Sequence, residues 1–140
     1  IGERGYGAGL FYLYVCVDRS QLEANLGKDA ALVSRSLRAL IEAITKVAPT
    51  GMQNSFASRA YASYVLAERG EQQPRSLAQA FLRPLRPRAD ENLLRLAIDA
   101  VETRVRNFDA VYGPCADSRY ELDVEAPKGT LDGLVGFTVA

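Results

Sequence analysis

An amphipathic segment at residues 30–47 constrains the fold of this chain most, because it must bury one of its faces. Apolar residues recur there at three- and four-residue steps, which predicts a helix. The helix is expected to begin after Asp29, a good N-cap residue, and to end before Pro49. The stripe that must pack against another layer is Val33, Leu37, Leu40, Ile41, Ile44 and Val47.

Three segments have the character of strands. The run Leu10–Val17 is apolar and aromatic, and its β-branched content favours a strand buried on at least one face. Tyr12 and Tyr14 then share a face, either as core residues under a helix or as a platform for stacking bases. Residues 62–68 predict a second strand. Residues 119–125 alternate charged with apolar residues and predict a third, half-exposed strand.

Three further segments carry helix-start signals, and a fourth has a helix pattern that Gly133 and Gly136 weaken. Ser20–Glu23 and Ser76–Gln79 match the capping-box pattern and predict short helices. Asp90 is expected to cap the longest helix, residues 91–112, and residues 130–139 predict a short final helix. The order is therefore strand, helix, strand, helix, strand. This order predicts an α/β (α+β) fold in which helices cover a small sheet.

The composition fits one domain over residues 1–140, of which 48% are hydrophobic. Lys plus Arg and Asp plus Glu number 17 each, so a field attracting nucleic acid must come from a local patch. No apolar run reaches membrane-spanning length, and the two cysteines are too few for a disulfide framework. We expect a cytoplasmic protein without a membrane partner. Residues 1–8 are expected to be a linker within a longer protein.

No catalytic constellation is visible in the sequence. The absence of histidine excludes His-based proton relays and His metal ligands. No nucleophile elbow, Walker loop or dinucleotide fingerprint occurs. Asp117, Asp123 and Glu125 form a loose acidic group, which is either a solvated strand edge or a metal site, and we favour the edge. We expect no catalytic residue, metal or cofactor, and a protein that is not an enzyme.

A polar loop at Pro49–Ala57 carries amides and hydroxyls but no acid. Such groups can hydrogen-bond a ligand without a charge of their own, and loops between rigid elements often hold binding groups. The alternative is an ordinary connection whose polar side chains satisfy their own backbone.

Two windows of the chain contain bases but no acid. Residues 43–67 hold Lys46 and Arg59, and residues 72–89 hold several arginines, of which the last three lie on a segment stiffened by two prolines. The arginines of the second window are Arg75, Arg83, Arg86 and Arg88. Arginine presents a planar fork of donors that suits phosphate. The windows are therefore either an anion-binding surface or solvated loops.

Three segments, in order, resemble one family. Residues 9–14 and the following Gln21–Gly27 resemble its strand and "QLxxNLG" helix, and Pro49–Ala57 resembles its signature loop. Leu77–Phe81, followed by a basic tail, resembles its "LAxAF" block. Together they resemble the CasC-type backbone subunit of the type I-E CRISPR surveillance complex, Cascade. The resemblance covers residues 9–113 and the C-terminal part of family members. Residues 114–140 remain unmatched.

This resemblance implies a partial RNA-recognition-motif-like (ferredoxin-like) palm. It implies a non-enzymatic subunit that polymerises along a CRISPR guide RNA and presents the spacer to target DNA. The implied partners are guide RNA, target DNA, sister copies and other Cascade subunits. An alternative is an assembly module without nucleic-acid contact in this segment. A small-molecule enzyme is a third possibility, but no motif supports it.

The resemblance also implies which residues face nucleic acid. The loop should lie along the RNA backbone, and the arginines of the proline-containing segment should face phosphate. The expected residues are Thr50, Gly51, Gln53, Asn54, Ser55, Arg59, Arg83, Arg86 and Arg88. Ala62 stands where family members often have proline, which leaves the start of the second strand less defined than the loop.

Overall fold

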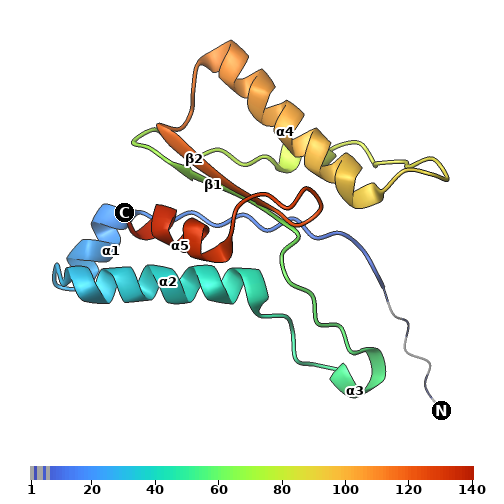
Figure 1. The fold of residues 1–140 in the computed structure, drawn as a ribbon, viewed down its shortest axis with the longest axis horizontal. Helices are drawn as coiled ribbons and strands as arrows, with labels where there is room; N and C mark the ends of the chain where they lie inside the picture. Colours follow the sequence, from blue (N-terminus) through green and yellow to red (C-terminus); the bar gives the residue numbers. More distant parts are fainter. Residues whose placement is uncertain (1, 3–4, 6) are drawn as a thin grey trace.

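The computed structural model describes residues 2, 5 and 7–140 and shows a mixed α+β fold (Figure 1). The described elements are α1 (Arg19–Asn25), α2 (Ala30–Lys46), α3 (Gln53–Phe56), β1 (Tyr64–Arg69), the 3-10 helix η1 (Ala78–Phe81), α4 (Leu93–Tyr112), β2 (Ser118–Asp123) and α5 (Leu131–Val139). The predicted small sheet with covering helices is confirmed. The RNA-recognition-like palm and the single-domain assignment stay predictions, and the expected linker at residues 1–8 lies partly outside the described residues.

The sheet consists of β1 and β2, which pair antiparallel with Tyr64 opposite Asp123 and Arg69 opposite Ser118. Helix α4 covers one face of this sheet and α5 covers the other, while α2 packs on the far side of α5 (Figure 1). Because side chains alternate along a strand, the two faces of β1 meet different helices. The sheet thus supports a helix on each of its faces.

The tightest apolar packing lies where α5 sits between α2 and the sheet. Leu134 and Val135 are 0% exposed, and the α2 residues Val33 and Leu37 are each 4% exposed. Full burial of such a side chain contributes roughly 1.5–3 kcal/mol. The predicted stripe is therefore fully buried at its start, and Leu40, Ile41 and Ile44 are half-buried. Val47 is 73% exposed instead, because α2 ends one residue earlier and the chain turns away.

A second apolar cluster lies on the other face of the sheet. Leu77, Val101 and Val105 are its buried members, and Tyr64 and Leu66 of β1 pack against them. This cluster buries Val101 and Val105 of α4, and it holds the start of η1 against that helix.

The predicted helices are present, but two of their caps are not the expected residues. Asp29 caps α2 as predicted, accepting a backbone N–H at 3.0 Å. Asp18 rather than Ser20 caps α1, and Asn92 rather than Asp90 caps α4, each accepting a backbone N–H at 2.8–2.9 Å. Asp, Asn and Ser are similarly good caps, so which one is used depends on where the incoming chain becomes extended. That position depends on tertiary packing.

The strand predicted at Leu10–Val17 is wrong. The segment forms no strand, and its backbone makes no hydrogen bond with another described residue. A strand needs a partner ladder as well as β-propensity, and β1 pairs only with β2. The expected order of three strands is therefore reduced to two in the described part of the chain.

The segment is nevertheless anchored through one of its tyrosines. The Tyr12 ring lies 5.7 Å from that of Phe81, and its hydroxyl accepts the N–H of Leu77 at 3.0 Å. Phe11 and Leu13, on the alternate face, are 91% and 66% exposed. Tyr12 thus packs against η1, whereas the apolar side chains of Phe11 and Leu13 are exposed to solvent.

Ion pairs join α4 to the sheet beyond the apolar cluster. Asp109 of α4 accepts Nη2 of Arg119 at 2.9 Å and Nη2 of Arg75 at 3.3 Å. Glu68 of β1 accepts Nη1 of Arg75 at 3.2 Å and Nε of Arg119 at 2.6 Å. We call these four half-buried side chains the ion cluster. Hydrogen bonds from Arg119 hold the pKa of Asp109 below its ordinary value of 3.8, although burial opposes the shift.

Replacing Asp109 with asparagine should lower the free energy of unfolding by about 1.5–3 kcal/mol at pH 7, because two arginines lose a charged acceptor. The folded-state pKa of Asp109 lies below the unfolded value. Its stabilisation is therefore complete above pH 3.8 and is lost as pH falls through the folded pKa. Urea unfolding at several pH values should show a constant difference from wild type above that pH and a shrinking one below it.

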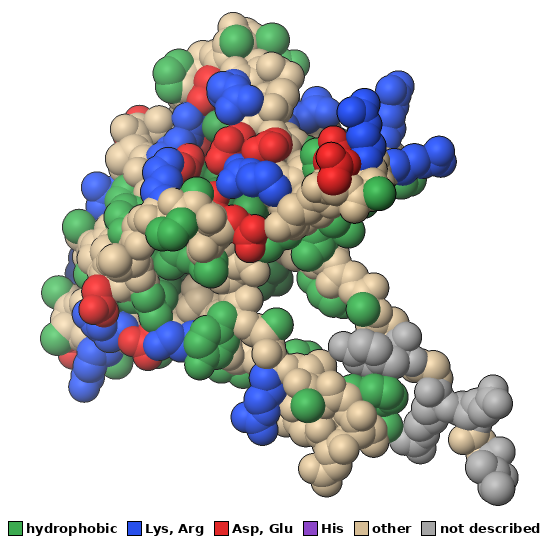
Figure 2. Space-filling view, turned by 45° about the vertical axis from the view of Figure 1, so that its right-hand side comes forward, with side chains coloured by type: hydrophobic (Ala, Val, Ile, Leu, Met, Phe, Trp, Pro, Cys, Tyr) green, Lys and Arg blue, Asp and Glu red, His purple; other side chains and the backbone are tan. Residues whose placement is uncertain are grey.

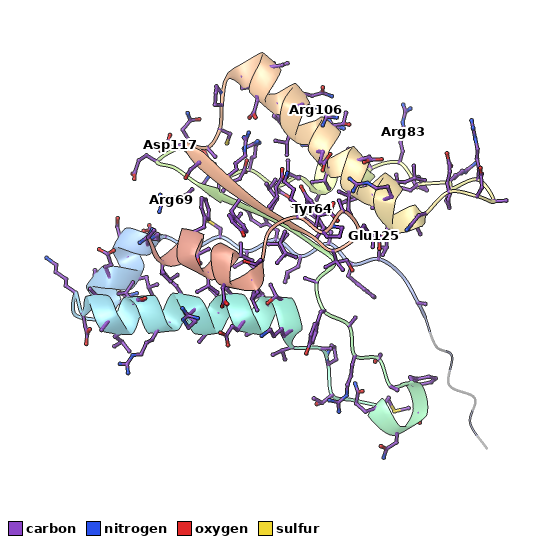
Figure 3. The ribbon with its side chains drawn as sticks, in the orientation of Figure 1. Tyr64, Arg69, Arg83, Arg106, Asp117 and Glu125 are labelled. Carbon is purple, nitrogen blue, oxygen red and sulfur yellow. The ribbon has the colours of Figure 1, made fainter. Side chains whose placement is uncertain are left out.

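Asp117→Asn is the matched control, since the Asp117 side chain is exposed and pairs with no other described residue (Figure 3). It should change stability by less than about 0.5 kcal/mol. Equal effects of the two substitutions would show that the ion cluster contributes nothing.

Copies of the 140-residue chain should self-associate through Leu10–Val17, because exposed apolar side chains and unpaired backbone groups favour pairing with a second copy. Sedimentation velocity should show a mass that rises with concentration. Phe11→Lys with Leu13→Lys should return the species to 15.3 kDa. The control, Val47→Lys with Val111→Lys, changes residues that are each 73% exposed outside this segment and should still associate. A wild-type chain that stays monomeric at high concentration contradicts the prediction.

Candidate nucleic-acid interface

Residues 46–61 run from the last residue of α2 towards β1 and form an arm that stands away from the body of the molecule (Figures 1 and 2). The base of the arm is closed by a hydrogen bond of 2.8 Å from the N–H of Ala62 to the carbonyl of Thr45. Helix α3 lies near its tip. The arm holds Lys46 and Arg59 but no acid. Loops with closed bases are frequent carriers of function.

Most of the predicted loop residues are exposed on this arm. Thr50, Asn54 and Ser55 make no side-chain hydrogen bond with another described residue, and Gly51 is also exposed. Lys46, at the base of the arm, is exposed and likewise has no ion-pair partner among the described residues. It lies in the acid-free window, although it is not among the residues that the sequence predicts to bind. These groups are available to a ligand.

Gln53 differs from its neighbours because its side chain is used within the arm. Its Nε2 donates to the carbonyl of Pro49 at 2.6 Å and to that of Ser58 at 3.3 Å. Its Oε1 accepts Nε of Arg59 at 3.3 Å. The alternative that polar loop residues satisfy their own backbone therefore describes Gln53, but not Asn54.

The second predicted group lies on the connection between η1 and α4, which is neither helix nor strand, as the prolines predict. Arg83, Arg86 and Arg88 are all exposed, and none forms an ion pair with a described acid (Figure 3 labels Arg83). The backbone N–H of Arg88 donates to the Glu91 carboxylate at 2.8 Å. Arg75, in contrast, belongs to the ion cluster and its side chain is 14% exposed. Three of the four arginines in this window are thus free to meet an anion.

The fold brings the two acid-free windows to the same end of the molecule. We call residues 82–89, which carry Arg83, Arg86 and Arg88, the arginine segment. The arm and the arginine segment both project from the end opposite α1 (Figure 1). Figure 2 shows Lys and Arg side chains gathered at the upper right of this end, above the arm. Glu125, which accepts Nδ2 of Asn92 at 2.8 Å, lies near the start of α4 and marks the edge of the basic region (Figure 3). Separate stretches of sequence therefore contribute to one side of the molecule.

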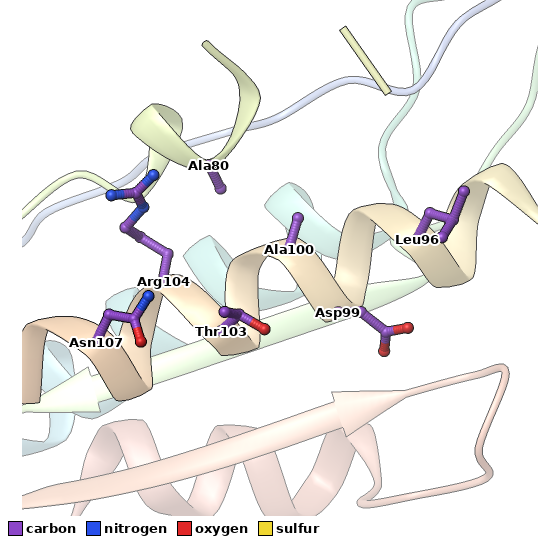
Figure 4. Close-up of a pocket in the computed structure, with 7 residues that line it drawn as sticks. All are labelled: Ala80, Leu96, Asp99, Ala100, Thr103, Arg104 and Asn107. Carbon is purple, nitrogen blue, oxygen red and sulfur yellow. The ribbon is translucent and has the colours of Figure 1, made fainter. Parts of the chain in front are cut away.

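Two hollows adjoin α4, and neither presents a free cluster of charge. The larger, about 380 Å³, is lined by Ala80, Leu96, Asp99, Ala100, Thr103, Arg104 and Asn107 (Figure 4). There Nη2 of Arg104 donates to the Gln79 carbonyl at 3.4 Å, and Asp99 pairs with Arg95. The smaller, about 260 Å³, lies between α4 and β2. The bases that line it pair with acids: Arg106 with Glu102, Arg119 with Asp109, and Lys128 with Glu121.

One member of the loose acidic group, Asp123, has a structural role at the end of β2. Asp123 is 5% exposed, and it accepts the backbone N–H groups of Glu125 at 2.8 Å and Ala126 at 3.1 Å. Burial raises its pKa, but hydrogen bonds from Ala126, Arg95 and Glu125 outweigh this and hold the pKa below its ordinary value. Among the described residues, no group of three or more acids and cysteines is arranged to hold a metal ion.

No helix in the described part of the chain is both long and apolar enough to cross a membrane.

Comparison with known proteins supplies the family. The sequence model of the CT1975-like proteins, a family of CRISPR-associated (Cas) proteins, matches residues 1–132. No curated protein matches the chain. The match includes most of the region after residue 113, which the resemblance to CasC leaves unassigned. The match confirms the expected CRISPR association. The more specific assignment to type I-E CasC stays a prediction. The chain belongs to the CT1975-like family of CRISPR-associated proteins.

Proposed function

We propose that this chain is part of a guide-RNA-binding backbone subunit of a CRISPR surveillance complex, of the type I-E CasC kind. In this proposal the subunit polymerises along the guide RNA, contacts sister copies and other Cascade subunits, and holds the spacer for pairing with target DNA. One observation carries the proposal. Two acid-free segments, each with exposed and unpaired polar or basic side chains, project from the same end of a Cas-family protein.

The arginine segment supplies the charge. Arg83, Arg86 and Arg88 have no acid to neutralise them among the described residues, so their guanidinium forks are free for phosphate. Pro84 and Pro87 restrict the backbone between them, which lowers the entropy lost when all three engage a ligand. Phosphate contacts of this kind give affinity and register without reading sequence.

The arm supplies neutral donors and acceptors. Thr50, Asn54 and Ser55 can reach phosphate oxygens or ribose hydroxyls without adding charge. Such contacts suit a subunit that must hold any spacer, because base pairing reads the sequence in guide-RNA systems and the protein recognises backbone and shape.

We propose further that the subunit is not an enzyme. On this account it acts by binding alone, and strand cleavage belongs to a separate partner. No residue of the arm or of the arginine segment is a nucleophile held beside a base.

A second function, an assembly module without nucleic-acid contact, is favoured by the exposed apolar segment Leu10–Val17. An Arg-Pro segment can also meet an acidic protein surface. The following experiment separates the two functions when RNA affinity is measured as described and assembly is measured separately, by sedimentation velocity without RNA.

Changing Arg83, Arg86 and Arg88 together to Glu in the protein at its natural length should weaken guide-RNA binding. It should also lower the slope of log affinity against log salt by about 2 per subunit, since each phosphate contact on a single strand contributes about 0.7. Fluorescence anisotropy with labelled guide RNA at several salt concentrations measures both quantities.

The control variant, Lys28→Glu with Arg35→Glu and Arg38→Glu, makes the same change in net charge on exposed residues around α2. It should leave the slope unchanged. Equal effects of the two triple variants would remove the arginine segment from RNA binding. Loss of assembly at unchanged RNA affinity would instead support the assembly function.

A further inference from the structure

Gln53 joins the two limbs of the arm. Pro49 precedes α3 and Ser58 follows it, and the carbonyls of both accept hydrogen bonds from the single Nε2 of Gln53, at 2.6 Å and 3.3 Å. The amide therefore bridges the limb that leaves α2 to the limb that returns towards β1.

The bridge holds the backbone in a conformation that is unfavourable by itself. Met52 and Ala57, on either side of α3, have left-handed backbones with φ of 60° and 46°. Residues with a Cβ atom rarely adopt this region, because it carries a conformational energy cost. Hydrogen bonds across the arm offset part of that cost and keep its tip closed.

The same amide orients the one arginine of the arm. Oε1 of Gln53 accepts Nε of Arg59 at 3.3 Å, while Nη1 and Nη2 of Arg59 have no partner among the described residues. An acid at residue 53 would fix the guanidinium equally well but would neutralise it. A neutral amide fixes the guanidinium and leaves its charge available, which fits an arm without any acid.

We propose that Gln53 is a positioning residue: it closes the arm and directs the free Nη1 and Nη2 edge of Arg59 at a phosphate of the bound nucleic acid. This rests on the proposed function. It gives Gln53 a role different from the direct RNA contact that the family resemblance implies. Arg59, Thr50, Asn54 and Ser55 are then the side chains of the arm that touch the ligand.

The test compares Gln53→Ala, Arg59→Ala, the double variant and the control Asn54→Ala in the protein at its natural length. Guide-RNA affinity is measured over a range of salt concentrations. Arg59→Ala should lower affinity and reduce the salt slope by about 0.7 per subunit, which corresponds to one phosphate. Gln53→Ala should give the same loss of slope although it removes no charge, and the double variant should lose no more slope than Arg59→Ala alone.

Asn54→Ala should lower affinity with an unchanged slope, since Asn54 is neutral and holds no arginine. Near-identical melting temperatures of all variants would show that the body of the fold is intact. A salt slope that Gln53→Ala leaves unchanged, whether or not affinity falls, would overturn the positioning role.

The outcomes also separate this inference from the proposed function. If Arg59→Ala changes binding and Gln53→Ala leaves the slope intact, only the inference fails. It also fails alone if Arg59→Ala has no effect while the Arg83, Arg86 and Arg88 variant does. If none of these variants changes guide-RNA binding, the proposed function fails and the inference fails with it.

Discussion

The ion cluster between α4 and the sheet is the interaction on which the arrangement of the functional surface depends. It joins β1, β2 and α4 through Glu68, Arg119 and Asp109, and it captures Arg75 at the point where the chain begins its path towards the free arginines. Apolar packing of Leu77 against α4 continues this support. The exposed arginine segment therefore starts from a fixed base and ends at the capped first turn of α4.

The chain has no net charge, so its capacity to attract an anion depends on which charges are neutralised. Half-buried ion pairs neutralise Arg75 and Arg119, whereas the basic side chains of the arm and of the arginine segment form no ion pair with a described acid. Such a surface suits the guide-RNA binding proposed for this member of a CRISPR-associated family, because RNA offers a continuous line of phosphates. In the proposed function, the neutral side chains of Thr50, Asn54 and Ser55 add contacts that do not depend on base identity.

Elements with strong local signals could be predicted from the sequence. Helix α2 follows from its apolar periodicity and its cap Asp29, β1 from its short apolar run, and the acid-free windows from composition alone. The features that could not be predicted depend on residues that are distant in the sequence. Leu10–Val17 has the propensity of a strand but no ladder to join, and Arg75 resembles its neighbours until Asp109, 34 residues away, is brought to it. The Gln53 side chain likewise bonds Ser58 and Arg59 only because the arm folds back on itself, and no sequence motif specifies that fold.

The central claim is that the arm and the arginine segment form one nucleic-acid surface, and crosslinking tests it most directly. The protein at its natural length, assembled on a photoreactive guide RNA, would be irradiated and digested, and the crosslinked peptides mapped by mass spectrometry. The account predicts crosslinks in both residues 46–61 and residues 82–89. Crosslinks confined to α1, α2 or α5, with neither segment labelled, would contradict it.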